Sequence, residues 1–316
     1  MKKLIALFLV TALFSCSSDE LVENASAKDQ LSVLDGDMLS FKDEESFVKE
    51  YDELASLNKN ELKDWVSAKK MTSLLNTLHD DTDMEEDVIP DSRIIYSDAL
   101  KSILNADSKV KVNGKVLWLN ERSFYLLSEV DSHKNTRELI DNIGELQVYG
   151  SLLNISSSGK SSTSRTAFPN ENGIKTFVSD EINVSGSRLR HVLDLYNETI
   201  VLNDIVQSSK MYLRTTLQYR SCSTFRCTWK EAMNERRLSS SLSCASCEQG
   251  VATFWYIYNV SPYVITGTQT FLVGNWYMAN YVVANPYVKY PASGLVTCSI
   301  EGVVPTPQIS LNVSWY

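Results

Sequence analysis

The spacing of hydrophobic residues changes from helical to strand-like near residue 150. In the first part, apolar residues every three or four positions predict a helix that begins near Ser40. These residues are Phe47, Tyr51, Leu54 and Leu57. Asn58 and Glu61 form a capping-box pattern that predicts a second helix, with an apolar face running to Leu78. The pattern therefore predicts a helical hairpin with a short turn at residues 57–60.

A β-hairpin is the clearest local signal in the first part of the chain. Asn113 and Gly114 lie at the middle of the alternating segment 109–119, and this dipeptide favours the positive φ angles of a type I′ turn. Further helices are predicted over residues 97–104 and 132–143. Helices beside a hairpin predict an α+β N-terminal region.

The second part of the chain alternates apolar and polar residues with a period of two. One face of the segment 211–220 carries Met211, Leu213, Thr215, Leu217 and Tyr219. The segments 254–260 and 309–315 repeat this alternation, and Gly, Pro, Asn and Ser bound further short apolar runs. The pattern predicts an all-β C-terminal region folded as an antiparallel sandwich, with an Ig-like arrangement as one version of it.

The first twenty residues predict export and lipid attachment. Two lysines precede an apolar run over residues 4–14, which is the order of a secretory signal. The run is too short to cross a bilayer as a helix, because that takes about 20 apolar residues. Residues 13–16, Leu-Phe-Ser-Cys, resemble the lipobox of bacterial lipoproteins. The resemblance implies that Cys16 is acylated, for example with palmitate, and becomes the mature N-terminus.

Two more stretches resemble lipoproteins of Bacteroides-type bacteria. Residues 17–20, Ser-Ser-Asp-Glu, resemble the export tag of their surface lipoproteins, and residues 41–75 resemble the N-terminal part of uncharacterised members. The second resemblance brings no known activity. Together they imply a protein that a lipid anchors to the outer membrane and that is exposed at the cell surface.

Sequence signals and charge divide the chain into five segments. We expect a signal peptide (1–15), the lipidated cysteine with a flexible tether (16–36), an α+β domain (37–150), a serine-rich linker (151–165) and a β-sandwich domain (166–316). Residues 1–150 contain 29 acidic and 17 basic residues, whereas residues 151–316 contain 10 and 13. The net charge of −9 argues against nucleic acid as a partner, because phosphate contacts need clustered Lys and Arg.

Four cysteines of the second half form two close pairs, Cys222 with Cys227 and Cys244 with Cys247. Such pairs are typical of a four-thiolate zinc site, but export favours disulfides, whose pairing the sequence leaves open. We therefore expect disulfides and neither a metal nor another cofactor. Cys298 lies on the apolar face of a predicted strand and is expected to be a buried free thiol.

Other residue types give little support for catalysis. The acidic run at residues 80–87 lacks the glycine turn and distal glutamate of an EF-hand, which favours a solvated linker over a calcium site. No hydrolase or metalloprotease motif surrounds His79, His133 or His191. We therefore expect a protein that is not an enzyme. The alternative is a hydrolase with a site between the two halves, using His191 and nearby carboxylates.

Aromatic density supports a binding function. Residues 251–290 contain eleven aromatic side chains, which either fill a sandwich core or line a ligand surface. Trp255, Trp276 and Tyr277 are the candidate ligand-binding residues. The sequence therefore favours a non-enzymatic binding or adhesion module, with a glycan or a protein as its ligand.

Overall fold

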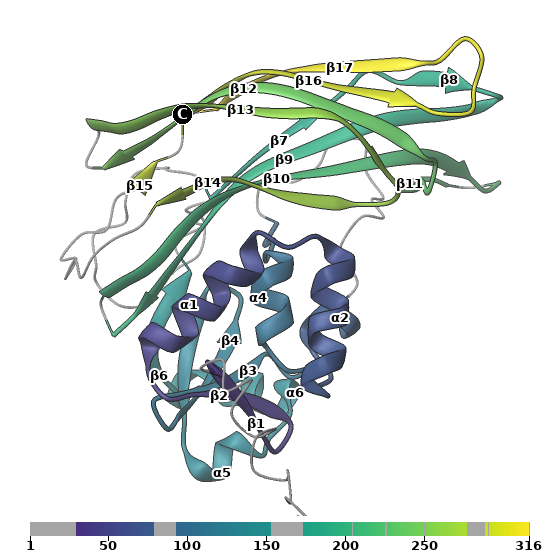
Figure 1. Ribbon diagram of the computed structural model, residues 1–316. Helices are drawn as coiled ribbons and strands as arrows, with labels where there is room; N and C mark the ends of the chain where they lie inside the picture. The colour runs from purple at the N-terminus through teal and green to yellow at the C-terminus, as the bar shows by residue number, and fades with distance from the viewer. Residues whose placement is uncertain are drawn as a thin grey trace, which may run out of the picture. The chain divides into compact units, whose positions relative to one another are not determined.

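Two long antiparallel strands, β9 (Ser187–Leu202) and β10 (Ile205–Cys222), link the helical and β-rich parts of the protein. The computed structural model describes residues 30–78, 93–152, 173–203, 205–224, 226–248, 251–276, 288–289 and 291–315. The chain divides into two compact units, residues 1–30 and 31–316, and the elements named below belong to the second. Most of β9 and β10 is buried, because helices pack on one face of the pair and a second sheet faces the other (Figure 1).

The larger sheet continues from the first half of the chain into the second. Among the described residues its main path is β1-β2-β3-β4-β5-β6-β9-β10-β11. The early strands are β1 (Ser32–Asp35), β2 (Met38–Phe41), β3 (Lys109–Val112), β4 (Lys115–Asn120), β5 (Ser123–Leu127) and β6 (Gln147–Leu152). β7 (Ile174–Val178) and β8 (Ile182–Val184) pair with β9, and β11 (Cys227–Glu231) and β14 (Gln269–Trp276) pair with β10.

The join between the halves is the pairing of β6 with the end of β9. Gly150 of β6 lies opposite Leu202, and a Cβ atom at this position would lie 2.2 Å from the carbonyl oxygen of Val201. A side chain would therefore push the two strands apart, which explains why a glycine is needed at this point of β6.

The helices of the first half pack as the hydrophobic spacing predicts, with changes at their ends. They are α1 (Glu44–Ala55), α2 (Lys59–Lys69), α3 (Leu74–Thr77), α4 (Asp98–Ile103), α5 (Glu129–Ser132) and α6 (Thr136–Asp141), followed by a 3₁₀ turn (Ile143–Glu145). The N-cap of α1 is Asp43 and not Ser40, since the Asp43 carboxylate accepts the Ser46 amide. The Asn58–Glu61 capping box is confirmed.

Two predicted helices are shorter than expected. α2 ends at Lys69, because Lys70 adopts a left-handed conformation (φ 58°), so the predicted helix to Leu78 is broken into α2 and α3. The predicted helix over 132–143 is replaced by α5 and α6, because the Asn135 capping box starts a new helix. The β3–β4 hairpin is confirmed, with positive φ at both Asn113 and Gly114.

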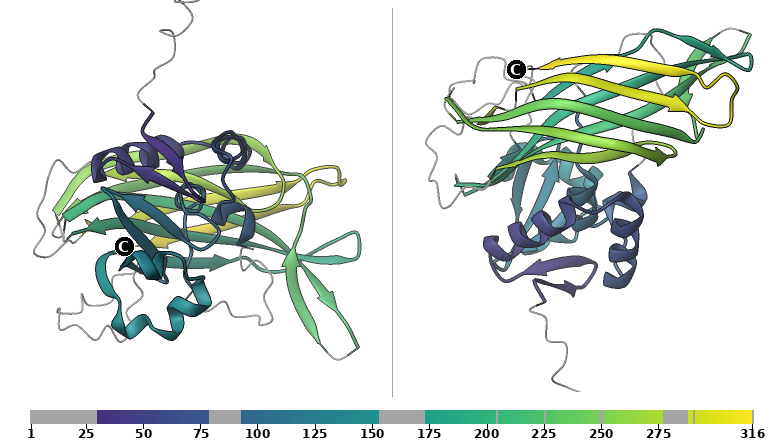
Figure 2. Two further views of the ribbon diagram at one scale, coloured as in Figure 1. Left: turned by 90° about the horizontal axis from the view of Figure 1, so that it is seen from below. Right: turned by 45° about the horizontal axis from the view of Figure 1, so that its top comes forward.

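The second sheet has five strands in the described residues, ordered β13-β12-β16-β17 with β15 beside β12 (Figure 2, right). They are β12 (Arg236–Glu248), β13 (Val251–Ile265), β15 (Val288–Lys289), β16 (Ala292–Ile300) and β17 (Gln308–Trp315). One hydrophobic cluster contains residues of β9, β10, β12, β16 and β17, so the two sheets share a core. A second cluster joins α1, α2 and α4 to the other face of β9 and β10.

The protein is therefore α+β with a predominantly β body, as predicted. The predicted tether 16–36 lies mostly outside the described residues, and its last residues include β1. Residues 153–165 of the predicted linker also lie outside them, so the division into two domains stays a prediction. In the described part of the chain, no helix combines the length and hydrophobicity that a membrane crossing requires.

Candidate functional site

Polar side chains fill the face of β9 and β10 that packs against the helices. The antiparallel register pairs Asp194 with Arg214, Tyr196 with Tyr212, and Glu198 with Lys210. We call these six residues the helix-facing layer. Each of them is at most 5% exposed. Buried polar groups are costly unless they are paired, so the contacts of this layer determine how the helices can dock.

Glu198 is the centre of one hydrogen-bond network in the helix-facing layer. The Tyr51 hydroxyl of α1 donates to Oε1 at 2.6 Å. The Ser97 hydroxyl donates to Oε1 at 2.6 Å, and the Ser97 amide donates to Oε2 at 2.9 Å. Tyr212 joins through a 3.0 Å contact with the Tyr51 hydroxyl. Burial is the main cause that raises the pKa of the Glu198 carboxyl, and the hydrogen bonds oppose it.

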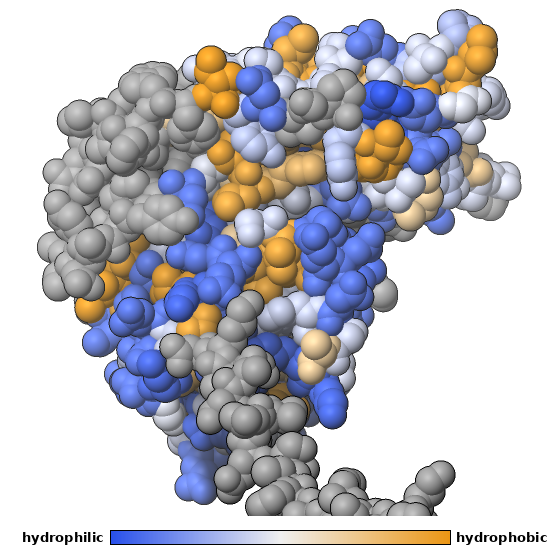
Figure 3. All heavy atoms as spheres, viewed as in Figure 1, coloured by the Kyte–Doolittle hydropathy of each residue, from blue (hydrophilic) through white to orange (hydrophobic). Residues whose placement is uncertain are grey.

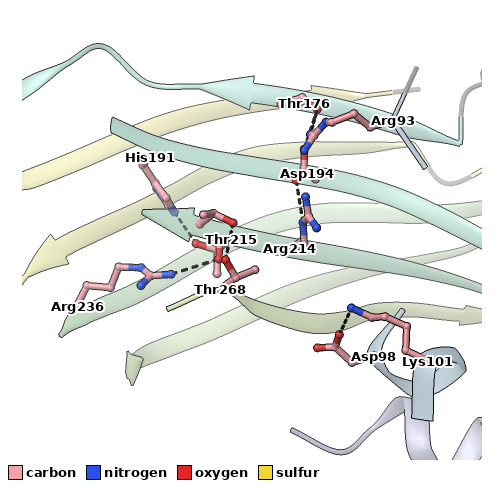
Figure 4. Close-up of polar contacts among 11 residues, drawn as sticks. Arg93, Asp98, Lys101, Thr176, His191, Asp194, Arg214, Thr215, Arg236 and Thr268 are labelled. Carbon is pink, nitrogen blue, oxygen red and sulfur yellow. Dashed lines mark hydrogen bonds and ion pairs between the residues drawn. The ribbon is translucent and has the colours of Figure 1, made fainter. Parts of the chain in front are cut away.

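Asp194 is the centre of a second network, shown in Figure 4. Its Oδ1 atom lies 2.5 Å from Nη2 of Arg93 and accepts the Thr176 hydroxyl at 2.7 Å. Its Oδ2 atom accepts Nε of Arg214 at 3.0 Å. One buried carboxylate therefore holds two arginines, one of which comes from the first half of the chain.

Lys210 is the third centre of the layer and lies where α1, β10 and β14 meet. Its Nζ atom lies 2.5 Å from Oδ1 of Asp52 and 2.9 Å from Oδ1 of Asn275. The Tyr51 ring lies 5.1 Å from the same nitrogen. Burial lowers the pKa of Lys210, and the nearby Asp52 carboxylate opposes this shift.

His191 lies on the opposite face of β9 from Asp194, so the predicted grouping of His191 with nearby carboxylates is not formed by these residues. Its Nε2 atom contacts the Thr215 hydroxyl at 2.5 Å, and Arg236 donates to the carbonyl oxygens of Thr215 and Gly267 (Figure 4). His191 is fully buried. Burial, and then the charge of Arg236, lower its pKa from 6.5 to about 3, so the ring is neutral at physiological pH.

In the part of the chain that the structure describes, Cys222 and Cys227 form a disulfide. The two residues lie opposite each other on β10 and β11, which confirms the expectation of a disulfide and gives the pairing that the sequence left open. Cys244 instead points into the shared core as a free thiol, because even-numbered residues of this part of β12 face inward with Leu242. The structure therefore does not support a second disulfide at Cys244, and the state of Cys247 stays a prediction because its side chain lies outside the described residues.

Cys244 and Cys298 are buried thiols, whose protonated form burial favours. Burial raises the pKa of Cys244 to about 12 and that of Cys298 to about 11. The prediction that Cys298 is a buried free thiol is confirmed. The side chain of Cys247 lies outside the described part of the molecule. Among the described residues, no three His, Cys, Asp or Glu side chains are grouped so that they could hold a metal ion.

Several predicted site residues lie outside the described residues of the structure. Cys16, His79, Tyr277 and the acidic run at 80–87 belong to segments that the structure does not describe. The backbones of Trp255 and Trp276 lie in β13 and β14, opposite Ala245 and Ser209, but their side chains are not described. His133 caps the C-terminus of α5. The aromatic site therefore stays a prediction.

The outer face of the five-stranded sheet carries hydroxyl and amide side chains and few charges. Odd-numbered residues of β12 and β16 and even-numbered residues of β17 point away from the shared core. The exposed or partly exposed polar residues of this outer face are Ser239, Ser241, Ser243, Asn259, Ser293, Ser299, Gln308, Ser310, Asn312 and Ser314. Exposed apolar residues also lie on this face, namely Ile257 and Val264 of β13 and Leu295 of β16. Arg237 lies at one end, where it pairs with Glu301 at 2.9 Å.

Surface hydropathy differs between the helices and the five-stranded sheet. In Figure 3 the helices present mostly hydrophilic residues, whereas the strands of the five-stranded sheet present a mixture of hydrophobic, neutral and hydrophilic ones. Sequence reasoning missed this outer face. Its signal was available in the serine alternation of β12, where Ser239, Ser241 and Ser243 occupy every second position.

Comparisons with known proteins add little to this description. No family model matches the chain, and no curated protein matches it. A solved structure of a DUF4848 family protein from Bacteroides thetaiotaomicron is similar at 12% sequence identity, with a TM-score of 0.22. The match covers 89% of this chain and 98% of the other. The function must therefore be argued from the residues of this chain.

Proposed function

We propose that this protein is a lipid-anchored binding module of the cell envelope that holds a neutral glycan on the outer face of its five-stranded sheet. The core shared by the two sheets supports a sandwich arrangement for the β-rich body. The observation that carries the function is the composition of the outer face, where exposed positions on four neighbouring strands carry hydroxyl or amide groups.

The chemistry of the outer face favours an uncharged sugar. Serine, asparagine and glutamine side chains can both donate and accept hydrogen bonds, as sugar hydroxyls do. Leu295 lies between Ser241 and Asn312 in the cross-strand register and offers an apolar contact for the C–H face of a sugar ring. A polyanionic glycan would instead need clustered arginine and lysine, but Arg237 is already paired with Glu301.

An enzymatic role receives less support from the same residues. Glu198, Asp194 and His191 are buried and paired with protein groups, so they are not open to a substrate. The described disulfide accords with an exported protein, since disulfides persist outside the cytoplasm.

The binding proposal is tested by placing a charge in the middle of the outer face. Asn312→Arg is expected to lower affinity for neutral polysaccharides at least tenfold, measured by affinity electrophoresis and calorimetry against neutral and sulfated glycans. A charge-matched control is Asn60→Arg on the exposed surface of α2, which should bind like wild type. Equal binding by both variants contradicts the proposal, as does binding of a protein ligand alone.

Trp255→Ala and Trp276→Ala test the aromatic candidates in the same assay.

The anchor is tested separately at Cys16. The lipobox-like sequence predicts a mature chain that begins with an acylated cysteine, so mass spectrometry of the N-terminal peptide should show the lipid. Cys16→Ser should move the protein from the membrane fraction to the soluble fraction. Recovery of unmodified wild-type protein with its leader intact would contradict the anchor and leave the glycan assay unaffected.

A further inference from the structure

A buried lysine meets a carboxamide and a carboxylate at one point of the larger sheet. Lys210 of β10 is fully buried, and its direct partner across the strand pair is Asn275 of β14. The Lys210 Nζ atom donates to the Asn275 carbonyl oxygen at 2.9 Å and lies 2.5 Å from the Asp52 carboxylate. The Lys210 amine therefore contacts both an amide carbonyl and a carboxylate that can accept its proton.

Burial disfavours the charged form of Lys210, although the Asp52 carboxylate opposes this effect. The Tyr51 ring lies beside the Lys210 nitrogen, and burial lowers the pKa of this lysine. A neutral amine is the nucleophilic form of lysine. The Ser208 hydroxyl donates to Oδ1 of Asp52 at 3.1 Å and helps to hold that carboxylate against the amine.

We propose that Lys210 and Asn275 become joined by an intramolecular isopeptide bond, with Asp52 carrying the proton. Asp52 takes one proton from the Lys210 ammonium, and the neutral Nζ atom then attacks Cγ of Asn275. The new C–N bond forms as the bond from Cγ to Nδ2 breaks. Nδ2 receives the proton held by Asp52 and a second proton released by Nζ, and it leaves as ammonium. Nothing is oxidised or reduced, and no co-reactant is consumed.

Position in the sheet makes this step geometrically simple. Lys210 and Asn275 are already cross-strand partners, so joining them requires a movement of side chains and leaves the strand register unchanged. Two other buried lysines contact groups of a different kind. Lys101 pairs with the carboxylate of Asp98 at 2.6 Å, and Lys109 donates to the main-chain carbonyl of Ser132 at 2.9 Å. Neither of these contacts offers an amide with ammonia as its leaving group.

The test is mass spectrometry of the full chain as the cell produces it. Compared with the mass expected for its processed, disulfide-bonded chain, the wild-type protein should be lighter by one ammonia. Protease digestion should release a branched peptide that joins the segments around Lys210 and Asn275. Lys210→Met and Asp52→Asn should have the expected mass without this deficit. Asn275→Asp should be lighter by one water, because the leaving group changes. Lys101→Met is the matched control and should keep the ammonia deficit.

Two results would overturn the bond. One is wild-type protein that is folded by circular dichroism and shows no ammonia deficit relative to its processed, disulfide-bonded chain. The other is an ammonia deficit that persists in Lys210→Met, since it would come from another amide. Wild-type mass decides the question even if a variant fails to fold. The outcome is independent of glycan binding and of the lipid anchor.

Discussion

Replacing Asp194 with alanine is expected to lower the free energy of unfolding by about 3–5 kcal/mol, because it leaves two buried arginines without their shared carboxylate. Arg93 and Arg214 both contact this side chain, from the segment before α4 and from β10. The side chain of Asp194 is 1% exposed, so water cannot replace the lost partner. Urea unfolding followed by circular dichroism measures the change.

The matched control for Asp194 is an exposed ion pair. Asp35 and Lys111 lie 2.7 Å apart, but the aspartate side chain is 52% exposed. Asp35→Ala is therefore expected to lower the free energy of unfolding by about 0–1 kcal/mol. If Asp194→Ala lowers the free energy of unfolding no more than Asp35→Ala does, the buried ion pairs of Asp194 do not stabilise the packing of the helices on β9 and β10. Arg214→Met in the Asp194→Ala background should recover part of the loss, because it removes one of the two buried charges that have lost the Asp194 carboxylate.

The second large effect is expected at Phe47 of α1. Phe47→Ala should lower the free energy of unfolding by about 3–5 kcal/mol, because it removes a fully buried ring and leaves a cavity. The ring packs edge-on against Phe41 of β2, with centroids 5.3 Å apart. Thermal unfolding monitored by circular dichroism measures the loss. Lys49→Ala, on the exposed side of the same helix, should leave stability within about 0.5 kcal/mol of wild type.

The elements set by local sequence are those that could be predicted. The spacing of Phe47, Tyr51 and Leu54 places one face of α1 in the core, and Asn113-Gly114 encodes its turn through its own φ preferences. Helix ends were less predictable. The left-handed Lys70 has no distinctive residue type, so nothing in the sequence marked the end of α2.

The candidate sites depend on long-range pairing, which the sequence does not reveal. The alternation of Tyr212, Arg214 and Gln218 with apolar residues is typical of a strand with one solvated face, but here helices cover that face. The contact of Lys210 with Asp52 and Asn275 joins residues far apart in the chain. For the cysteines, the sequence predicted disulfides but left their pairing open, and the pairing of Cys222 with Cys227 follows from the register of β10 and β11.

The pairing of β6 with β9 has a consequence for the order in which the protein can fold. The core under α1 and α4 includes Tyr196, Ile200 and Tyr212, which the ribosome adds long after the helices themselves. A nascent chain that stops before β9 lacks those side chains, and its β6 strand has no neighbour on that side. We therefore expect the early helices to remain loosely packed until β10 has emerged, and a fragment ending at residue 152 to be sensitive to proteases.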